Sequence, residues 1–242
     1  MRLIRLDETD STNEYLKRQI RKGLKIIPVA VSTLSQTAGK GRQGKKWESD
    51  IGKNVLMSIA CHYKHDHITL NKLSAIILAN TLKNLFPYLD FKIKWPNDII
   101  VRGKKIAGIL IEKVKSTYIV GIGINTNQTD FGNLKYATSI KKISGQDVDN
   151  TKVILKIISQ FENFSQMLSK PAVHMLYEDS LWGLNKTVIV KAGELKLTGI
   201  IKEVNYYGSL VLKTRSGKLL TFPENKASIP YEFINSSLYG NF

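Results

Sequence analysis

The chain has 242 residues, a hydrophobic content of 43% and a formal net charge of +16. Such a length supports one large domain, or one ordinary domain and a small one. No stretch approaches the ~18 uninterrupted apolar residues of a membrane span. The N-terminus "MRLIRLDETD" lacks the apolar core of a signal peptide, and the single Cys61 excludes an internal disulfide. We therefore expect a cytoplasmic globular protein without a membrane partner.

The positive charge leaves several classes of partner open. It favours nucleic acid, phosphorylated ligands or an acidic protein, but it is equally typical of a solvated lysine-rich surface. The lysines are scattered, and no block of five or six like charges forms a basic arm or tail. Charge alone selects none of these readings.

The first half of the chain alternates strand and helix patterns around a long loop. Ser11 and Glu14 form a capping box, and Gly23 is a plausible helix stop. Residues 35 to 53 are glycine-rich, basic and aperiodic, and a loop of that length is usually functional or disordered. The patterns predict strands over 2–6, 26–34 and 54–63, and helices over 10–23 and 69–86.

The second half predicts an antiparallel meander, then helices, then a purely β region. A tight turn is expected at Arg102 and Gly103. The predicted segments are strands over 91–95, 98–114 (two strands) and 117–125, helix within 151–181, and short strands from Lys186 onward. The prediction is an α+β fold with a mixed, mainly antiparallel sheet in a domain over residues 1–183 and a small β-barrel domain over 184–242.

The segment "AGKGRQGKKWES" matches two phosphate-binding motifs imperfectly. Gly39, Gly41 and Gly44 fit the dinucleotide fingerprint, while Lys46 occupies the position where a P-loop needs Ser or Thr. Both motifs require a helix that starts at the glycines, and no helical pattern follows them. The glycines instead let the backbone approach an anion, and Trp47 indicates that the loop packs rather than being disordered.

Five short sequence motifs, in this order along the chain, carry a family resemblance: "DSTN", "QTAGKGRQGKKW", "KWPND", "KIAGILIE" and "GIGIN". Together they closely resemble the catalytic domain of bacterial biotin protein ligases, the biotin-[acetyl-CoA-carboxylase] synthetases. The resemblance implies a class II synthetase-like catalytic domain followed by an SH3-like domain. It also implies the activity: biotin and Mg-ATP form biotinyl-5′-adenylate, and a lysine of the biotin carboxyl carrier protein then attacks it.

The same resemblance implies the site residues. Lys105, Arg42 and Asp98 are the catalytic candidates, with Lys105 near the biotin carboxylate and the α-phosphate and Asp98 receiving the acceptor lysine. The biotin candidates are Ser11, Thr12, Asn13, Gln36, Lys40, Gly41, Arg42 and Lys105. The ATP and adenylate candidates are Arg42, Lys45, Trp47, Asn97 and Asn125.

Some of these positions also have simpler explanations or depart from the family. Ser11 can be an N-cap, and "KWPND" can be a structural turn because Pro96 forces Trp95 into an extended geometry. The family's loop is G-R-G-R-R-G, so Lys40 and Gln43 replace arginines here. The aromatic that stacks on adenine is not identified by the pattern, and Tyr136 is only a guess.

Alternatives remain at the level of function. A lipoate-protein ligase shares the fold and the chemistry, and a basic nucleic-acid-binding module would fit the charge. Because "DSTN" begins at Asp10, we expect no preceding winged helix and no specific DNA binding. His62, His65 and His67 lack zinc-site spacing, so the expected metal is Mg²⁺ carried by ATP. The resemblance implies a possible homodimer, since the family often pairs through the edge of the meander, and an exposed edge strand could equally receive a strand of the carrier.

Overall fold

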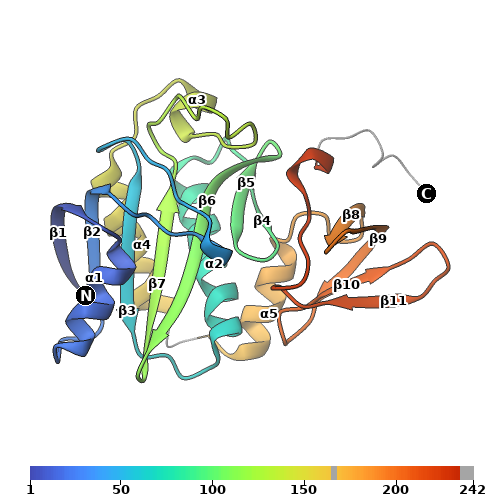
Figure 1. Ribbon diagram of the computed structural model, residues 1–242, viewed down its shortest axis with the longest axis horizontal. Coiled ribbons are helices and arrows are strands. Elements are labelled where there is room, and N and C mark those ends of the chain that lie inside the picture. Colours follow the sequence, from blue (N-terminus) through green and yellow to red (C-terminus); the bar gives the residue numbers. More distant parts are fainter. Residues whose placement is uncertain (165–167, 235–242) are drawn as a thin grey trace.

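The computed structural model describes residues 1–164 and 168–234, and it confirms the α+β prediction (Figure 1). The helices are α1 (Thr12–Arg21), α2 (His67–Leu85), α3 (Ile140–Ser144), α4 (Asn150–Phe164) and α5 (Lys170–Asp179), with short 3₁₀ turns η1 (Arg42–Gly44) and η2 (Tyr231–Phe233). The strands are β1 (Arg2–Thr9), β2 (Val29–Gln36), β3 (Val55–Cys61), β4 (Phe91–Lys94), β5 (Asp98–Val101), β6 (Lys104–Val114), β7 (Thr117–Ile124), β8 (Thr187–Ala192), β9 (Leu195–Val204), β10 (Leu210–Lys213) and β11 (Leu219–Phe222).

A seven-stranded sheet forms the centre of the molecule, in the order β1-β2-β3-β7-β6-β5-β4. Strands β1 and β2 are parallel, and every other neighbouring pair is antiparallel. Strands β4 to β7 are the predicted meander. The turn between β5 and β6 has positive φ at both Arg102 (48°) and Gly103 (73°), as a two-residue hairpin loop with the right twist requires.

The two faces of this sheet are covered by different helices. Leu16 and Ile20 of α1 pack on one face, against Val29 and Val31 of β2. The opposite face packs against α2 and α4 in the larger core, to which alternate residues of β3 contribute, namely Val55, Met57, Ile59 and Cys61. The intervening β3 residues therefore face the α1 side, where the N-terminus of α1 meets the sheet.

Residues 187–222 form a second, four-stranded antiparallel sheet in the order β11-β10-β9-β8. It stands where the small β-barrel is predicted, and the description as SH3-like stays a prediction. The core is continuous from α2 into this sheet through Ile201, Val204 and Leu210. The buried indole of Trp95 donates to the carbonyl of Gly208 at 2.9 Å. After β11 the chain returns toward the first sheet (Figure 1).

Local details differ from the sequence predictions in three places. Ser11 precedes α1 but makes no side-chain capping bond, and Glu14 is drawn to lysines instead, so the capping box is wrong. Strand β1 extends to Thr9 because it pairs in parallel with β2 over its whole length. The helical stretch 151–181 is two helices, with residues 165–167 outside the described residues; residues 235–242 of the predicted second domain also lie outside them.

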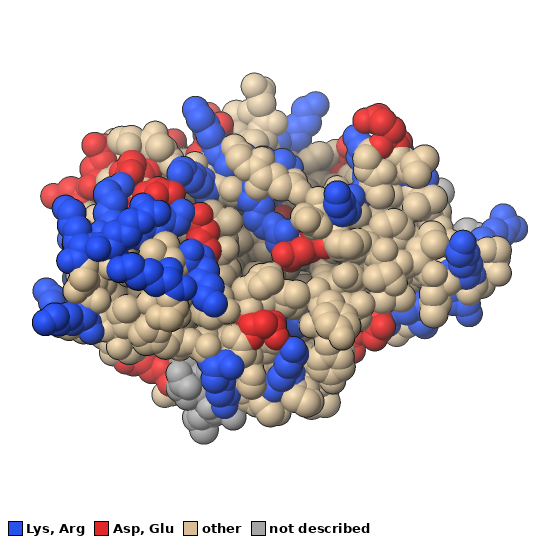
Figure 2. All heavy atoms as spheres, turned by 60° about the horizontal axis from the view of Figure 1, so that its bottom comes forward, with Lys and Arg blue, Asp and Glu red and all other residues tan. Residues whose placement is uncertain are grey.

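The surface charge is unevenly distributed (Figure 2). Figure 2 shows a dense group of Lys and Arg side chains on one side of the face in view. The N-terminal part of the chain has several exposed cations, with Arg2 and Arg5 on β1, Arg18 and Arg21 on α1, and Lys22 directly after α1. Across the described residues, no helix has both the length and the apolarity to cross a membrane.

Lys72 of α2 joins the two sheets and should give stability a pH dependence. Its buried ammonium donates to the carbonyls of Val204 and Asn205, both at 2.9 Å, and burial lowers its pKa to about 8 from an ordinary 10.5. Between these values the unfolded chain binds a proton that the folded chain does not, so the free energy of unfolding rises with pH. We expect wild type to gain stability relative to Lys72→Met between about pH 7.5 and about pH 9.5 in urea unfolding.

The matched control for this prediction is Lys83→Met, which removes an exposed lysine from the last turn of the same helix. Its unfolding curves should follow wild type at both pH values. If wild type and Lys72→Met instead run parallel with pH, the Lys72 ammonium is not the group that titrates.

Candidate functional site

A cavity of about 580 Å³ opens on the α1 side of the central sheet. Its wall is built from the N-terminus of α1, the segment "AGKGRQGKKWES" (residues 38–49, hereafter the glycine loop), strands β6 and β7, and the C-terminal segment between residues 224 and 231. Every site residue predicted from the sequence lines it: Ser11, Thr12, Asn13, Gln36, Lys40, Gly41, Arg42, Lys45, Trp47, Asn97, Asp98, Lys105 and Asn125. Segments more than 100 residues apart in sequence thus meet at one cavity.

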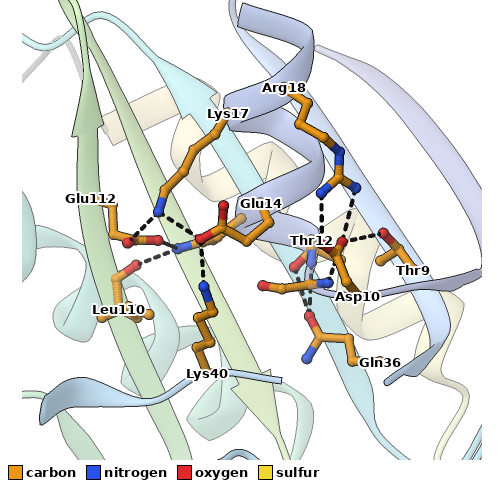
Figure 3. Close-up of polar contacts among 12 residues, drawn as sticks. Thr9, Asp10, Thr12, Glu14, Lys17, Arg18, Gln36, Lys40, Leu110 and Glu112 are labelled. Carbon is orange, nitrogen blue, oxygen red and sulfur yellow. Dashed lines mark hydrogen bonds and ion pairs between the residues drawn. The ribbon is translucent and has the colours of Figure 1, made fainter. Parts of the chain in front are cut away.

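One end of the cavity is a set of small buried polar groups (Figure 3). The Thr12 backbone nitrogen and hydroxyl both donate to Gln36 Oε1, at 2.9 and 3.2 Å. Ser58 Oγ of β3 lies 2.6 Å from both Thr12 Oγ1 and Asn13 Oδ1. Because its oxygen is occupied, Gln36 turns its amide nitrogen away from the helix (Figure 3). This end can therefore offer oriented donors and acceptors to a small polar ligand.

An ion-pair network ties the glycine loop to α1 and β6 (Figure 3). Asn13 Nδ2 donates to Glu112 Oε2 at 2.8 Å, and Lys17 bridges Glu112 and Glu14 at 2.5 and 2.9 Å. Lys40 of the loop reaches the same Glu14 carboxylate at 2.8 Å. Because the Lys40 ammonium is already paired, it neutralises a protein carboxylate in this conformation.

The glycine loop forms no helix beyond the three-residue turn η1, in agreement with the rejection of the Rossmann and P-loop motifs. It closes on itself through a bridge between Lys40 and Lys46. The indole of Trp47 lies flat over the sheet at β7, where a Cβ on Gly123 would fall 2.5 Å from Cζ2. A Cβ on Gly108 would come within 3.1 Å of the same ring. These two glycines make room for the indole, which anchors the loop.

A compact charged cluster lies beside Trp47 of the glycine loop. Lys105 Nζ of β6 is 2.6 Å from Asp98 Oδ1, and the hydroxyl of Tyr231 donates to Asp98 Oδ2 at 2.7 Å. Burial raises the pKa of Asp98, but the Lys105 and Lys94 ammonium groups outweigh it and hold that pKa below its ordinary value. Asp98 is therefore ionised at neutral pH, and Lys105, with a partly exposed side chain, faces the cavity 5.4 Å from the Trp47 ring centre.

Lys94, Glu224 and Tyr231 also line the cavity, and the sequence did not identify them as site residues. Lys94 is buried, its pKa is lowered by burial to about 8, and it lies 4.2 Å above the Tyr231 ring. Glu224 forms an ion pair with Arg42 at 2.9 Å, so the glycine loop contacts the C-terminal segment. Lys94 is the first residue of the "KWPND" motif, so the sequence could have identified it. The C-terminal β segment offered no motif that could have singled out Glu224 or Tyr231.

Other predicted residues make mainly backbone contacts at the edge of the cavity. Asn97 Nδ2 donates to the carbonyl of Ile109 at 2.6 Å, which ties the β4–β5 turn to β6. The Asn125 backbone nitrogen donates to the carbonyl of Ile106 at 2.8 Å. Tyr136 lines the cavity and stacks on Tyr231, with ring centres 5.9 Å apart and planes at 18°.

The cluster that could hold a metal ion lies elsewhere. Among the described residues, His174, Glu178 and Glu203 each bring one potential ligand atom within 4.8 Å of the others. The Lys72 ammonium lies 2.9 Å from His174 Nδ1. A donor there leaves the ring proton on Nε2, the atom that faces Glu178 at 3.7 Å. We interpret this cluster as an ion network between α2, α5 and β9.

Comparison with known proteins gives consistent findings. Residues 6–128 match the model of the biotin/lipoate A/B protein ligase family. The bifunctional ligase/repressor BirA of Bacillus subtilis is 32% identical over 200 residues, which cover 75% of this chain but 60% of that protein. The biotin-[acetyl-CoA-carboxylase] ligase of Paracoccus denitrificans is 26% identical over 235 residues, covering 88% and 95% of the two chains.

Among solved structures, the biotin protein ligase from Aquifex aeolicus in complex with biotin and ATP superposes with a TM-score of 0.81. It is 28% identical, and the superposition covers 95% of this chain and 98% of that one.

Proposed function

Because the chain belongs to the biotin/lipoate A/B protein ligase family, we propose that it is a biotin protein ligase. It activates biotin with ATP to biotinyl-5′-adenylate and transfers the acyl group to a lysine of the biotin carboxyl carrier protein. The observation that carries this proposal is that residues from all five family motifs line one cavity around a cationic centre. The alternative, lipoate activation, is disfavoured by the same loop and by "KWPND".

Biotin is assigned to the polar end of the cavity. Ser11, Thr12 and Asn13, together with Gln36, supply hydrogen-bonding groups of the size that a ureido ring needs. The carboxylate of biotin would then point toward Lys105. Lys40 and Gly41 contribute chiefly through their backbone, because the Lys40 ammonium is paired with Glu14. This arrangement removes the difficulty of a lysine in place of the family's arginine.

ATP is assigned to the remaining cavity, beside Arg42, Lys45, Trp47, Asn97 and Asn125. Adenylate formation accumulates negative charge on the α-phosphate and on the departing pyrophosphate, and fixed cations stabilise that charge best where water is excluded. Lys105 is the central cation because it faces the cavity beside an ionised Asp98. The glycine loop covers the intermediate and keeps water from it.

Mg²⁺ is proposed to enter as the ATP complex. In the part of the chain that the structure describes, three carboxylates line the cavity. Asp98 and Glu224 are already paired with Lys105 and Arg42, and Glu48 is exposed on the glycine loop, so these three form no cluster of unpaired carboxylates ready for a resident metal ion. When bound, the ion would neutralise phosphate charge. The residues of this chain supply the orientation and the remaining positive charge.

The remaining parts of the proposal are the role of Asp98 in transfer, the compartment, the domain ranges and the surface for a partner strand. Asp98 receives the acceptor lysine, whose ammonium must lose a proton before it attacks the carbonyl. We place the enzyme in the cytoplasm, where ATP and the carrier are found, and assign residues 1–183 to catalysis and 184–242 to a second domain. The edge strand β1 of the central sheet is the candidate for a homodimer contact or for the carrier's strand, because the outer edge of β4 is already hydrogen-bonded to residues 180–182.

Pyrophosphate exchange into ATP tests the first half of this proposal. The purified enzyme with Mg-ATP should exchange labelled pyrophosphate when biotin is present, and it should show at most background exchange with lipoate. Exchange that depends on lipoate and not on biotin would reverse the assignment.

Loss of the ion pair between Arg42 and Glu224 should let the biotinyl-adenylate intermediate escape from the cavity. Both Arg42→Gly and Glu224→Gln remove the ion pair that fastens the glycine loop to the C-terminal segment. We expect faster release of biotinyl-adenylate, measured as biotin incorporated into lysines of bystander albumin, by about tenfold because one charge-assisted bond is lost. Arg18→Gln, which breaks the exposed pair with Asp10, is the matched control and should not raise labelling.

A further inference from the structure

Tyr231 is held in the cavity wall by two contacts to its ring. Tyr136 stacks on one side at 5.9 Å between ring centres, and the Lys94 ammonium lies 4.2 Å from the ring centre. The residue itself comes from η2, after the second sheet, and thus from the far end of the chain. These two ring contacts favour one orientation of the ring, and that orientation directs the hydroxyl toward Asp98.

That hydroxyl is a permanent donor to Asp98. It lies 2.7 Å from Asp98 Oδ2, and burial and the neighbouring carboxylate raise the pKa of Tyr231 well above 10. Lys105 engages the other oxygen, Oδ1, at 2.6 Å. The two oxygens of one carboxylate are therefore held by two different elements. One of these two partners of Asp98, Lys105, also stabilises the phosphate charge during adenylate formation.

We propose that Tyr231 is a positioning residue for the acyl-transfer step, an inference that rests on the proposed ligase function. When the phosphate of the adenylate draws the Lys105 ammonium away, Asp98 Oδ1 becomes available to the incoming lysine. The hydroxyl of Tyr231 remains on Oδ2 and keeps the carboxylate from rotating out of line. The C-terminal segment thereby takes part in transfer, although the first sheet supplies the groups that touch the reacting atoms.

The transfer step removes two protons from the acceptor ammonium and moves one acyl group. A proton passes from the acceptor ammonium through Asp98 to solvent, which leaves the carboxylate ionised again, and the free amine attacks the acyl carbonyl. The new amide C–N bond forms as the C–O bond to phosphate breaks, and AMP leaves with that electron pair. The second amine proton is lost to solvent with the product. A carboxylate held in one orientation favours this sequence because the nitrogen must approach the carbonyl along a narrow path.

Tyr231→Phe tests the proposal, because it removes one oxygen atom and keeps the ring contacts. We expect the kcat of transfer to a carrier domain to fall about tenfold, the loss typical of one hydrogen bond to a charged group. Biotin-dependent pyrophosphate exchange and the KM for the carrier should stay within about twofold of wild type. The matched control is Tyr177→Phe, which removes a buried hydroxyl 3.5 Å from the Pro96 carbonyl in the same "KWPND" segment, without contact to Asp98.

A double variant separates positioning from a structural role. In an Asp98→Asn background, Tyr231→Phe should cause no further loss of transfer, because the residue acts through Asp98. Equal losses in exchange and transfer, a full additional loss in the double variant, or unchanged transfer in Tyr231→Phe would each overturn the inference. A wild-type enzyme that shows no exchange with biotin would instead overturn the proposed function.

Discussion

Lys105→Met should lower the rate of biotin-dependent pyrophosphate exchange by about a hundredfold or more. That is the loss usually seen when one fixed group that stabilises transition-state charge is removed. The structure supports a large effect because Lys105 faces the cavity beside the ionised Asp98 and beneath the covering loop. The adjacent Lys104→Met is the matched control: Lys104 is exposed on the same strand and should leave exchange unchanged. Exchange at the wild-type rate in Lys105→Met would remove this residue from the mechanism.

The same variant should also be less stable at neutral pH. Lys105 helps to keep the pKa of the buried Asp98 low, and a carboxyl with a lowered pKa stabilises the fold above its ordinary value of 3.8. Losing this partner should cost about 1–3 kcal/mol at pH 7. The deficit relative to wild type should shrink as the pH falls below about 4, where the carboxyl becomes protonated in the unfolded chain. Urea unfolding at both pH values measures it.

Gly123→Ala should disable the covering loop while leaving the sheet intact. The new Cβ would overlap the indole of Trp47, and the backbone beneath it is fixed by pairing with both β3 and β6. We expect the loop to detach, the transfer of biotin to the carrier to fall about tenfold or more as the adenylate escapes to water, and the far-ultraviolet circular dichroism to stay native.

A compensating variant identifies the cause of that loss. Trp47→Leu removes the ring that the new methyl group would strike, so adding Gly123→Ala to Trp47→Leu should cause little further loss. If the two losses multiply in the double variant, Gly123 acts through something other than the anchor of the loop.

The central sheet could be predicted largely from local patterns. Alternation and the turn at Arg102 and Gly103 gave the meander, because hairpins join neighbours in sequence. The parallel pairing of β1 with β2 could not be predicted in this way, since no local turn specifies it. The capping box failed because Glu14 forms ion pairs with Lys17 and with Lys40, which comes from a distant loop.

The cavity residues also divide into those that a local sequence pattern predicts and those that only long-range contacts bring to the site. All five sequence motifs contribute residues to the cavity lining. They could be found from the sequence because each motif is a continuous segment with a recognisable pattern. Glu224 and Tyr231 were missed because they act as single residues in a segment whose local pattern is only that of a β region. Their contacts with Arg42 and Asp98 span 182 and 133 residues of sequence, and only the folded chain brings them together.

The intact mass of a carrier domain is the most direct test of the proposed function. The purified enzyme is incubated with Mg-ATP, a biotin carboxyl carrier domain and either biotin or lipoate. We predict a single biotinyl adduct on the carrier with biotin, its absence when the acceptor lysine is replaced by arginine, and no lipoyl adduct. A lipoyl adduct without a biotinyl one, or no adduct from an enzyme that is folded, would contradict the account.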